Sequence, residues 1–275
     1  GPPRIITAAS LFDGHDAAIN VMRRLIQSAG AEVIHLGHDQ SAKAVVDCAI
    51  QEDAHGVALT SYQGGHVEYF TYIRQLLDEA GCEHIRIFGG GGGTITPPEI
   101  KTLHESGISK IYSPDDGRTM GLMGMIHHLM GIASEVDLIH PDRVASLSGP
   151  VTAQDTAKVG LLLTMSESAD DSTFKATLDQ CRSSEKEVPV IGFTGTGGAG
   201  KSSLLDELML RIRRDNPNSK IALLATDPTR KKTGGALLGD RIRMNSLSDD
   251  GLFMSCLLYT SDAADEGLGV DLGGR

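Results

Sequence analysis

The sequence predicts two successive α/β units: a flavodoxin-like, doubly wound domain and then a truncated P-loop domain. Three observations predict this fold class. From Arg4 to about Met130, short β-branched apolar runs alternate with amphipathic stretches, the pattern of a parallel sheet covered by helices. A G-x-x-x-x-G-K-S motif occupies residues 195–202, directly after another apolar run. The length of 275 residues suits about two domains.

The first unit, residues 1–133, is predicted to contain five strands and five helices. The predicted strands are Arg4 to Ala8, Glu32 to Leu36, Gly56 to Thr60, His84 to Phe88 and Lys110 to Tyr112. The predicted helices are His15 to Ser28, Ala42 to Gln51, Val67 to Ala80, Pro97 to Glu105 and Thr119 to Met130. In a sheet of this kind, ligands bind at the carboxyl ends of the strands.

Composition excludes several classes of protein. The 25 Lys and Arg against 36 Asp and Glu give a net charge of −11, which argues against a nucleic-acid partner. No apolar run is long enough to cross a membrane and no signal-peptide pattern is seen, so we expect a cytoplasmic protein without a membrane partner. The four cysteines form no C-x-x-C pair, which indicates neither a zinc site nor a disulfide framework. Because Gly1 stands where an initiator Met is expected, we expect a piece of a longer protein.

Three loops follow strands at the predicted ligand edge. They are Asp13-Gly14-His15, Ser61-Tyr62-Gln63-Gly64-Gly65 and the glycine run 89–93. Consecutive glycines lose much backbone entropy on folding, so we interpret the run as bare main chain against which a bulky ligand lies; a mobile loop is the alternative. A dinucleotide fingerprint is disfavoured because no G-x-G-x-x-G follows the first strand.

The pair Asp13 and His15 has two readings. A carboxylate bonded to one imidazole nitrogen fixes the tautomer and makes the other nitrogen a better metal ligand. The alternative is that Asp13 caps the following helix and His15 is exposed.

These three loops together resemble the cobalamin-binding domain of adenosylcobalamin-dependent acyl-CoA mutases. Its motif D-x-H-x-x-G is matched from Asp13 except that Ala18 replaces the glycine. The resemblance implies that His15 is the lower cobalt ligand and that Asp13 holds it. It further implies that the displaced nucleotide tail lies in a groove lined by Ser61, Gly64, Gly65, Gly89, Gly90 and Gly91. A signalling receiver domain is disfavoured, since Ser61 and Ser113 stand where its acceptor Asp and its Lys are needed.

Residues 134–186 are predicted to be an interdomain linker with one helix, Thr152 to Leu163. We expect no chemistry there. At Val188 a buried strand is predicted as far as Thr194, and the P-loop and a helix follow it. In such a loop, backbone N–H groups surround the β-phosphate, Lys201 neutralises phosphate charge, and the Ser202 hydroxyl binds Mg²⁺. The candidate nucleotide-binding residues are Gly195, Gly197, Gly198, Ala199, Gly200, Lys201, Ser202 and Ser203.

The segment beyond the P-loop resembles the metallochaperone G proteins that gate cobalamin loading of acyl-CoA mutases. Asp227 ends a predicted strand where a carboxylate can reach Mg²⁺. The resemblance implies that Asp240 also helps to hold Mg²⁺, that Arg243 contacts the nucleotide, and that the nucleotide is GTP.

The resemblance stops after Met254. Residues 255–275 resemble translated sequencing-adapter DNA, and we expect them to be a non-native tail. The base-reading motif N-K-x-D is absent from the sequence, so the G domain, residues 187–254, is incomplete and is expected to have a marginal core.

The order of the two modules resembles that of mutases in which a substrate-binding (β/α)₈ barrel follows in the same chain. This implies adenosylcobalamin, GTP and Mg²⁺ as cofactors, a carbon-skeleton rearrangement of a branched acyl-CoA, and a homodimeric parent protein. The catalytic residues would lie in the barrel, so we expect no turnover by this stretch. A cobalamin-carrier or regulatory module and a stand-alone cobalamin chaperone are the alternatives.

Overall fold

The computed structural model describes residues 1–182, 188–196, 198–227, 236–238, 244–248 and 251–258. Its first half is the predicted doubly wound unit, a parallel sheet in the order β5-β4-β3-β1-β2-β7. The strands are β1 (Arg4–Ser10), β2 (Glu32–Gln40), β3 (Gly56–Thr60), β4 (Arg86–Gly90), β5 (Lys110–Tyr112) and β7 (Ala236–Leu238). The helices are α1 (Asp16–Ser28), α2 (Ala42–Gln51), α3 (His66–Glu79), α4 (Pro97–Glu105) and α5 (Pro114–Ser134). All five predicted strands and all five predicted helices are therefore present, and β7 is an added edge strand.

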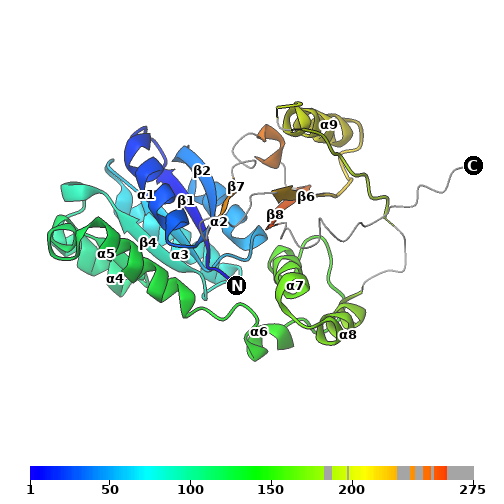
Figure 1. Ribbon diagram of the computed structural model, residues 1–275, viewed down its shortest axis with the longest axis horizontal. Coiled ribbons are helices and arrows are strands. Elements are labelled where there is room, and N and C mark those ends of the chain that lie inside the picture. The colour runs from blue at the N-terminus through cyan, green and yellow to red at the C-terminus, as the bar shows by residue number, and fades with distance from the viewer. Residues whose placement is uncertain (183–187, 197, 228–235, 239–243, 249–250, 259–275) are drawn as a thin grey trace, which may run out of the picture.

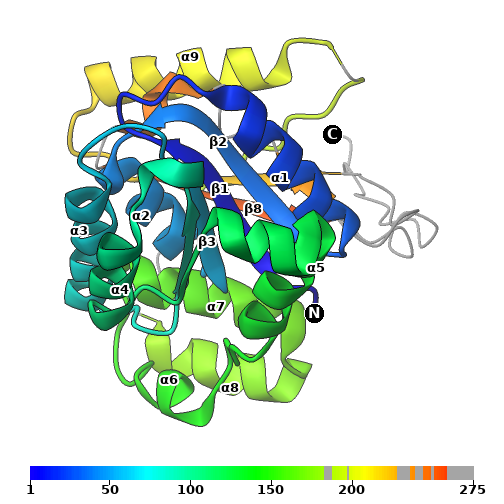
Figure 2. The same ribbon diagram turned by 90° about the vertical axis from the view of Figure 1, so that its left-hand side faces the viewer.

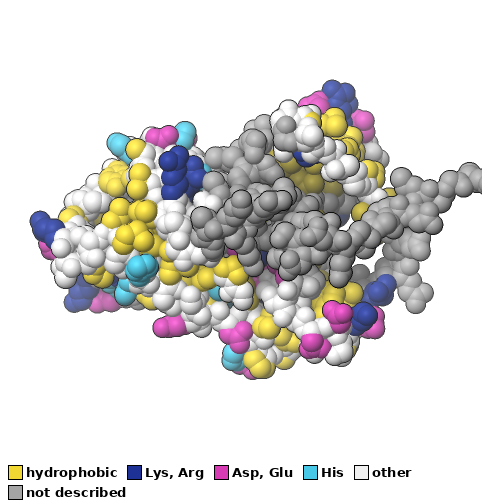
Figure 3. All heavy atoms as spheres, viewed as in Figure 1, with side chains coloured by type: hydrophobic (Ala, Val, Ile, Leu, Met, Phe, Trp, Pro, Cys, Tyr) yellow, Lys and Arg dark blue, Asp and Glu magenta, His cyan; other side chains and the backbone are white. Residues whose placement is uncertain are grey.

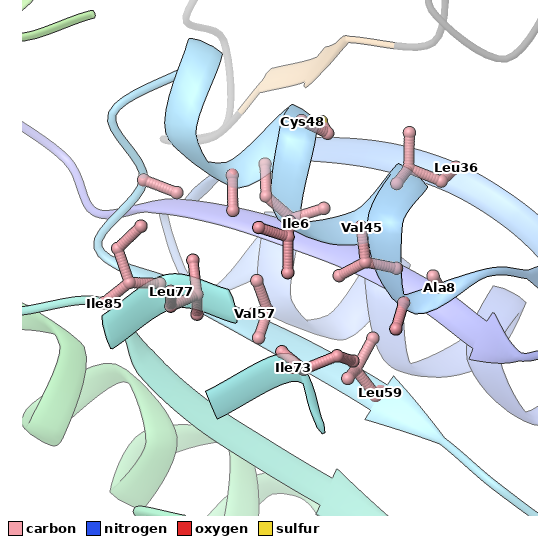
Figure 4. Close-up of a cluster of buried hydrophobic side chains, with 14 of the residues drawn as sticks. Ile6, Ala8, Leu36, Val45, Cys48, Val57, Leu59, Ile73, Leu77 and Ile85 are labelled. Carbon is pink, nitrogen blue, oxygen red and sulfur yellow. The ribbon is translucent and has the colours of Figure 1, made fainter. Parts of the chain in front are cut away.

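Helices cover both faces of this sheet (Figures 1 and 2). Strand β1 lies in the middle, and all seven of its residues are buried. Neighbouring side chains on a strand point to opposite faces, so Ile6 packs under α2 and α3 (Figure 4) while Ile5 packs under α1 and α5. Each fully buried isoleucine stabilises the fold by about 1.5–3 kcal/mol. The two-sided core fixes where the carboxyl ends of the strands meet.

Helix α5 is longer than the predicted Thr119 to Met130 and is interrupted once. It begins with a capping box, in which Ser113 and Asp116 bond each other's main-chain N–H groups. Gly121 then breaks the helical path with φ 66° and ψ 172°. The helix thus has two segments, and the second covers one face of the sheet through Ile126, Leu129 and Ala133.

The predicted linker is better ordered than we expected, since it contains α6 (Pro141–Ala145), α7 (Thr156–Ser168) and α8 (Asp171–Cys181). Leu161 and Met165, one turn apart on α7, form a small core with Leu147 and Cys181. Helix α7 also packs on α2, and the Arg4 guanidinium in β1 bonds the Glu167 carboxylate of α7 at 2.9 Å. The prediction of one helix without a core was wrong because these apolar positions find partners on neighbouring helices.

The second half contains α9 (Lys201–Asp215) and a parallel pair of strands, β6 (Ile221–Asp227) and β8 (Leu252–Leu258), with a short turn η3 (Asn245–Ser248). Met209, Met254 and Cys256 are buried in the same cluster as residues of α2. The two-stranded sheet buries apolar side chains against the first unit. This agrees with the prediction that the second unit has only a marginal core of its own.

The predicted buried strand from Val188 to Thr194 was wrong. These residues form no strand, and the Val190 side chain is 93% exposed. A strand is buried only where neighbours pair with its main chain and cover its side chains, and neither happens to this segment in the described part of the chain.

Strand β8 crosses the predicted boundary at Met254 and continues to Leu258. The Glu52 carboxylate accepts bonds from the Ser255 hydroxyl and the Cys256 amide. Residues 259–275 of the predicted tail lie outside the described residues. No helix in the described residues is both long and apolar enough to cross a bilayer.

Candidate functional site

The loop after β1 brings Asp13 and His15 together at the carboxyl edge of the sheet. Asp13 Oδ1 accepts hydrogen bonds from His15 Nδ1 at 2.7 Å and from the His15 amide at 3.0 Å. Asp13 Oδ2 accepts a bond from the amide of Tyr62, in the loop after β3, at 2.7 Å. Both carboxylate oxygens are thus engaged, and the two loops are joined through one side chain.

Burial and hydrogen bonding act in opposite directions on Asp13, whose residue surface is fully buried. Burial alone would raise the pKa of its carboxyl group, but the Tyr62 amide, the His15 amide and the His15 imidazole together hold this pKa below its usual value. Asp13 is therefore an anion that can accept a hydrogen bond from the Nδ1–H group of His15.

The His15 side chain is 64% exposed. With its Nδ1 proton directed at Asp13, the Nε2 lone pair is free to bind a metal. The sequence reading of Asp13 as only a helix cap does not account for this bond, because the carboxylate contacts the imidazole as well as the main chain.

An apolar cavity of about 580 Å³ lies beside this pair. Helices α1 and α5 form two walls, and the ends of β3, β4 and β5 form the floor. Ala18, the departure from the family motif, is one of the residues that line it. Figure 3 shows hydrophobic side chains gathered on this face of the molecule, between α1 and α5. The volume lies within the range of small-molecule sites.

The glycine run lines the cavity through Gly89, Gly90, Gly91 and Gly92, and at two of these positions the protein itself requires glycine. A Cβ on Gly89 would lie 2.4 Å from the Phe70 ring, and one on Gly91 would lie 1.9 Å from the Ser61 carbonyl oxygen. These glycines therefore let α3 and the loop after β3 approach closely, in addition to presenting main chain to the cavity.

The cavity is lined by Thr60 and not by Ser61, the residue that we expected to line the groove. Side chains alternate along β3, so the Ser61 hydroxyl points away from the cavity and accepts a bond from Ser10 at 2.9 Å. The Thr60 side chain lines the cavity, and its buried hydroxyl has no hydrogen-bond partner among the described residues. The alternation of side chains along β3 places Thr60 on the same face as Ala58, which packs on the α1 side. Gly64 and Gly65 form an exposed turn before α3 and do not line the cavity.

The P-loop has a folded conformation in the described residues. Lys201, the first residue of α9, turns its ammonium group back to the carbonyl oxygens of Gly195 and Thr196, at 2.7 and 2.9 Å. Gly200 precedes the helix with φ 79°, a left-handed conformation that favours glycine. Ser202 and Ser203 are in the first turn of α9. The loop therefore curls around the lysine at the positive end of a helix, an arrangement that suits a phosphate group.

The rest of the predicted nucleotide site is only partly visible. Asp227 is the last residue of β6, as predicted, and its side chain is not among the described ones. Gly197, Asp240 and Arg243 lie outside the described residues.

Two family models match this chain, one for each half. Residues 3–111 match the B12 binding domain, and residues 159–265 match the methylmalonyl-CoA mutase-associated GTPase MeaB. The second match extends past the predicted boundary at Met254.

Similar proteins are found for the whole chain and for its first half. A fused isobutyryl-CoA mutase of Geobacillus kaustophilus is 51% identical over 92% of this chain, and one of Cupriavidus metallidurans is 51% identical over 96%. The small subunit of 2-hydroxyisobutanoyl-CoA mutase from Aquincola tertiaricarbonis is 34% identical over 42% of this chain and 82% of its own length. This chain spans 24% of the length of the two fused mutases. The chain contains a B12 binding domain followed by a MeaB-type GTPase domain, and over nearly its whole length it is similar to fused isobutyryl-CoA mutases.

Proposed function

We propose that the first unit binds cobalamin with His15 as the lower cobalt ligand. The observation that carries this proposal is the bond from His15 Nδ1 to the buried Asp13 carboxylate, which leaves Nε2 available as a ligand on a side chain that is 64% exposed. The neighbouring cavity supports it, because a cofactor whose own base is displaced by histidine needs a separate place for its nucleotide tail.

The cavity fits such a tail in two respects. It is large and apolar enough for a substituted benzimidazole, and its glycines leave main chain uncovered. The buried hydroxyl of Thr60 lacks a protein partner in the described residues. Since an unpaired buried hydroxyl costs about 1–3 kcal/mol, a polar atom of the tail would satisfy it. We therefore assign the tail contact to Thr60, Gly89, Gly90 and Gly91, with Ser61 in support.

The second half is proposed to bind GTP with Mg²⁺. Lys201 now holds two loop carbonyl groups, and we propose that its ammonium group bonds nucleotide phosphate oxygens instead when they are present. Ser202, Asp227 and Asp240 are the proposed Mg²⁺ ligands, and Arg243 is the proposed nucleotide contact.

For the full-length protein we propose the rearrangement between isobutyryl-CoA and n-butyryl-CoA, with the GTPase domain controlling cofactor loading. Adenosylcobalamin supplies the radical chemistry that such a rearrangement needs. This chain's residues bind and orient the cofactor, and the acyl-CoA contacts belong to a barrel domain outside this chain. A homodimer and a cytoplasmic location are further parts of the proposal that rest on family resemblance.

The ligand assignment is tested by electron paramagnetic resonance of the whole chain reconstituted with cob(II)alamin. The protein is prepared with ¹⁴N-histidine and with ¹⁵N-histidine. If His15 binds cobalt, the nitrogen splitting changes from a triplet to a doublet on labelling. If the splitting is the same with both histidine isotopes, benzimidazole remains bound to cobalt, and the proposal would fail.

Two variants complete this experiment. His15→Ala should abolish the label-dependent splitting. His38→Ala is the matched control, because His38 is exposed near the end of the adjacent strand β2 and bonds through its main chain to Gln40. It should leave the spectrum unchanged.

A further inference from the structure

Tyr62 contacts the proposed cobalt ligand in two ways. Its amide donates to Asp13 Oδ2 at 2.7 Å. Its ring lies beside the His15 ring, with centroids 5.6 Å apart and planes tilted by 53°. This separation is within the range of favourable aromatic pairs. The half-buried Tyr62 side chain also lines the cavity, so it stands between the imidazole and the proposed tail groove.

The loop that carries Tyr62 is held against the glycine run. The Ser61 amide donates to the Gly90 carbonyl at 2.9 Å, and the Ser61 carbonyl occupies the space that a Cβ on Gly91 would need. A Cβ on Gly92 would lie 3.4 Å from the Tyr62 ring. The position of the Tyr62 ring is thus set by main-chain contacts on one side and by the imidazole on the other.

A single hydrogen bond does not fix the plane of an exposed imidazole. The Nδ1 bond to Asp13 restrains one point of the ring, which can still swing about that bond. A second contact on the ring face restricts this motion and so determines where Nε2 points. The described residues supply one aromatic neighbour to His15, and it is Tyr62.

We propose that the Tyr62 ring is a positioning residue that orients the His15 imidazole for metal ligation. The inference rests on the proposed cobalamin function. Its action is through ring contact rather than through the hydroxyl, which has no hydrogen-bond partner among the described residues. The Tyr62 ring is proposed to act on His15, the cobalt ligand, and not on the nucleotide tail. This distinguishes its role from that of a residue that only lines the groove.

The test uses two corrinoids, cobalamin and cobinamide, which lacks the nucleotide tail. Dissociation constants are measured with the whole chain carrying Tyr62, Tyr62→Phe, Tyr62→Leu or Tyr62→Ala. Tyr72→Ala is the control, because Tyr72 is a half-exposed tyrosine on α3 outside the cavity. Every variant keeps the amide that anchors Asp13.

The expected result is that the Ala and Leu variants bind both corrinoids about three- to tenfold more weakly, which is the size of an aromatic pair interaction. Phe should bind like the native chain. The ¹⁵N-dependent splitting should broaden in the Ala and Leu variants, since the imidazole adopts a range of orientations. The Leu variant keeps a large apolar side chain but has no aromatic ring. Its affinities therefore test the role of the ring even if the Ala variant disturbs the loop.

Three outcomes would overturn the inference. Unchanged affinities and spectra would show that the ring has no such role. A loss confined to cobalamin would make Tyr62 a tail contact, and a Phe variant as weak as Ala would assign the effect to the hydroxyl. Absence of ¹⁵N-dependent splitting in the native chain would instead refute the proposed function.

Discussion

Replacing Gly91 by alanine tests whether the glycine run serves the protein's own packing. An added Cβ would lie 1.9 Å from the Ser61 carbonyl oxygen, 3.0 Å from its carbonyl carbon and 3.2 Å from Ile95 Cγ1. Because the nearest obstacle is main chain, rotation of a side chain cannot relieve the clash. The loop after β3 must move away from β4, and it would move the Tyr62 amide away from Asp13 with it.

The size of the effect follows from overpacking costs. Insertion of one methyl group into a packed interior costs about 1–3 kcal/mol, and we expect the upper end because the clash is with main chain of the buried residue Ser61. A loss of about 3 kcal/mol corresponds to roughly a hundredfold increase in the population of open states. Gly93→Ala is the matched control, since no atom lies within 4 Å of its added Cβ.

The assay is hydrogen exchange followed by mass spectrometry on peptides from β3 and β4, with the whole chain. This readout reports the first unit separately, which a single unfolding curve of a chain with several units does not. Gly91→Ala should speed exchange in these peptides roughly a hundredfold and weaken corrinoid binding, and Gly93→Ala should do neither. Native-like exchange in Gly91→Ala would refute the packing role.

Three further predictions concern other parts of the chain. Burial and the charge of Arg23 lower the pKa of His35 to about 4. Its folded pKa is below the unfolded value of 6.5, so its contribution to stability is present above pH 6.5 and is lost as the pH falls. This loss of unfolding free energy is about 2 kcal/mol at pH 5. In urea unfolding, the His35→Gln variant should lose less unfolding free energy between pH 7 and pH 5 than the native chain loses. An equal loss in the two proteins would contradict the assignment. Glu167→Gln removes an ion pair to buried Arg4 and should destabilise the docking of α7 by about 1–3 kcal/mol. Relative to the native chain, hydrogen exchange should become faster in α7 than it does in α3. An equal change in the two helices would argue against this role of the ion pair. Lys201→Ala should weaken Mg²⁺–nucleoside triphosphate binding at least about tenfold in a fluorescent-nucleotide titration, whereas an unchanged affinity would show that the loop is not a phosphate site.

Hydrophobic periodicity was sufficient to predict the first unit. Its strands are short apolar runs buried on both faces, and its helices have clear caps such as Ser41 and Thr96. The same signal misled at Val188 to Thr194, because an apolar run predicts a strand only where partners exist to pair with it. For the linker, α7 has apolar residues on several sides, and its packing depends on α2 and α8, which the local sequence does not specify.

In the candidate site, residue type and spacing left two readings of Asp13 and His15 open, and only the resemblance of the three loops to a cobalamin-binding domain favoured the metal-ligand reading. Thr60 was missed since choosing between two adjacent hydroxyl residues requires knowing which face of β3 each one occupies. The roles of Tyr62 were also hidden, as one of them belongs to its main chain. Contacts made through peptide groups carry no residue-type signal.

The Tyr62 amide has a consequence for how this site can vary. A peptide N–H is present whatever side chain occupies position 62, with proline as the one exception. The carboxylate of Asp13 thus retains a donor through nearly any replacement there. A replacement of Tyr62 would therefore change the ring contact with His15 and leave this hydrogen bond to the supporting aspartate in place.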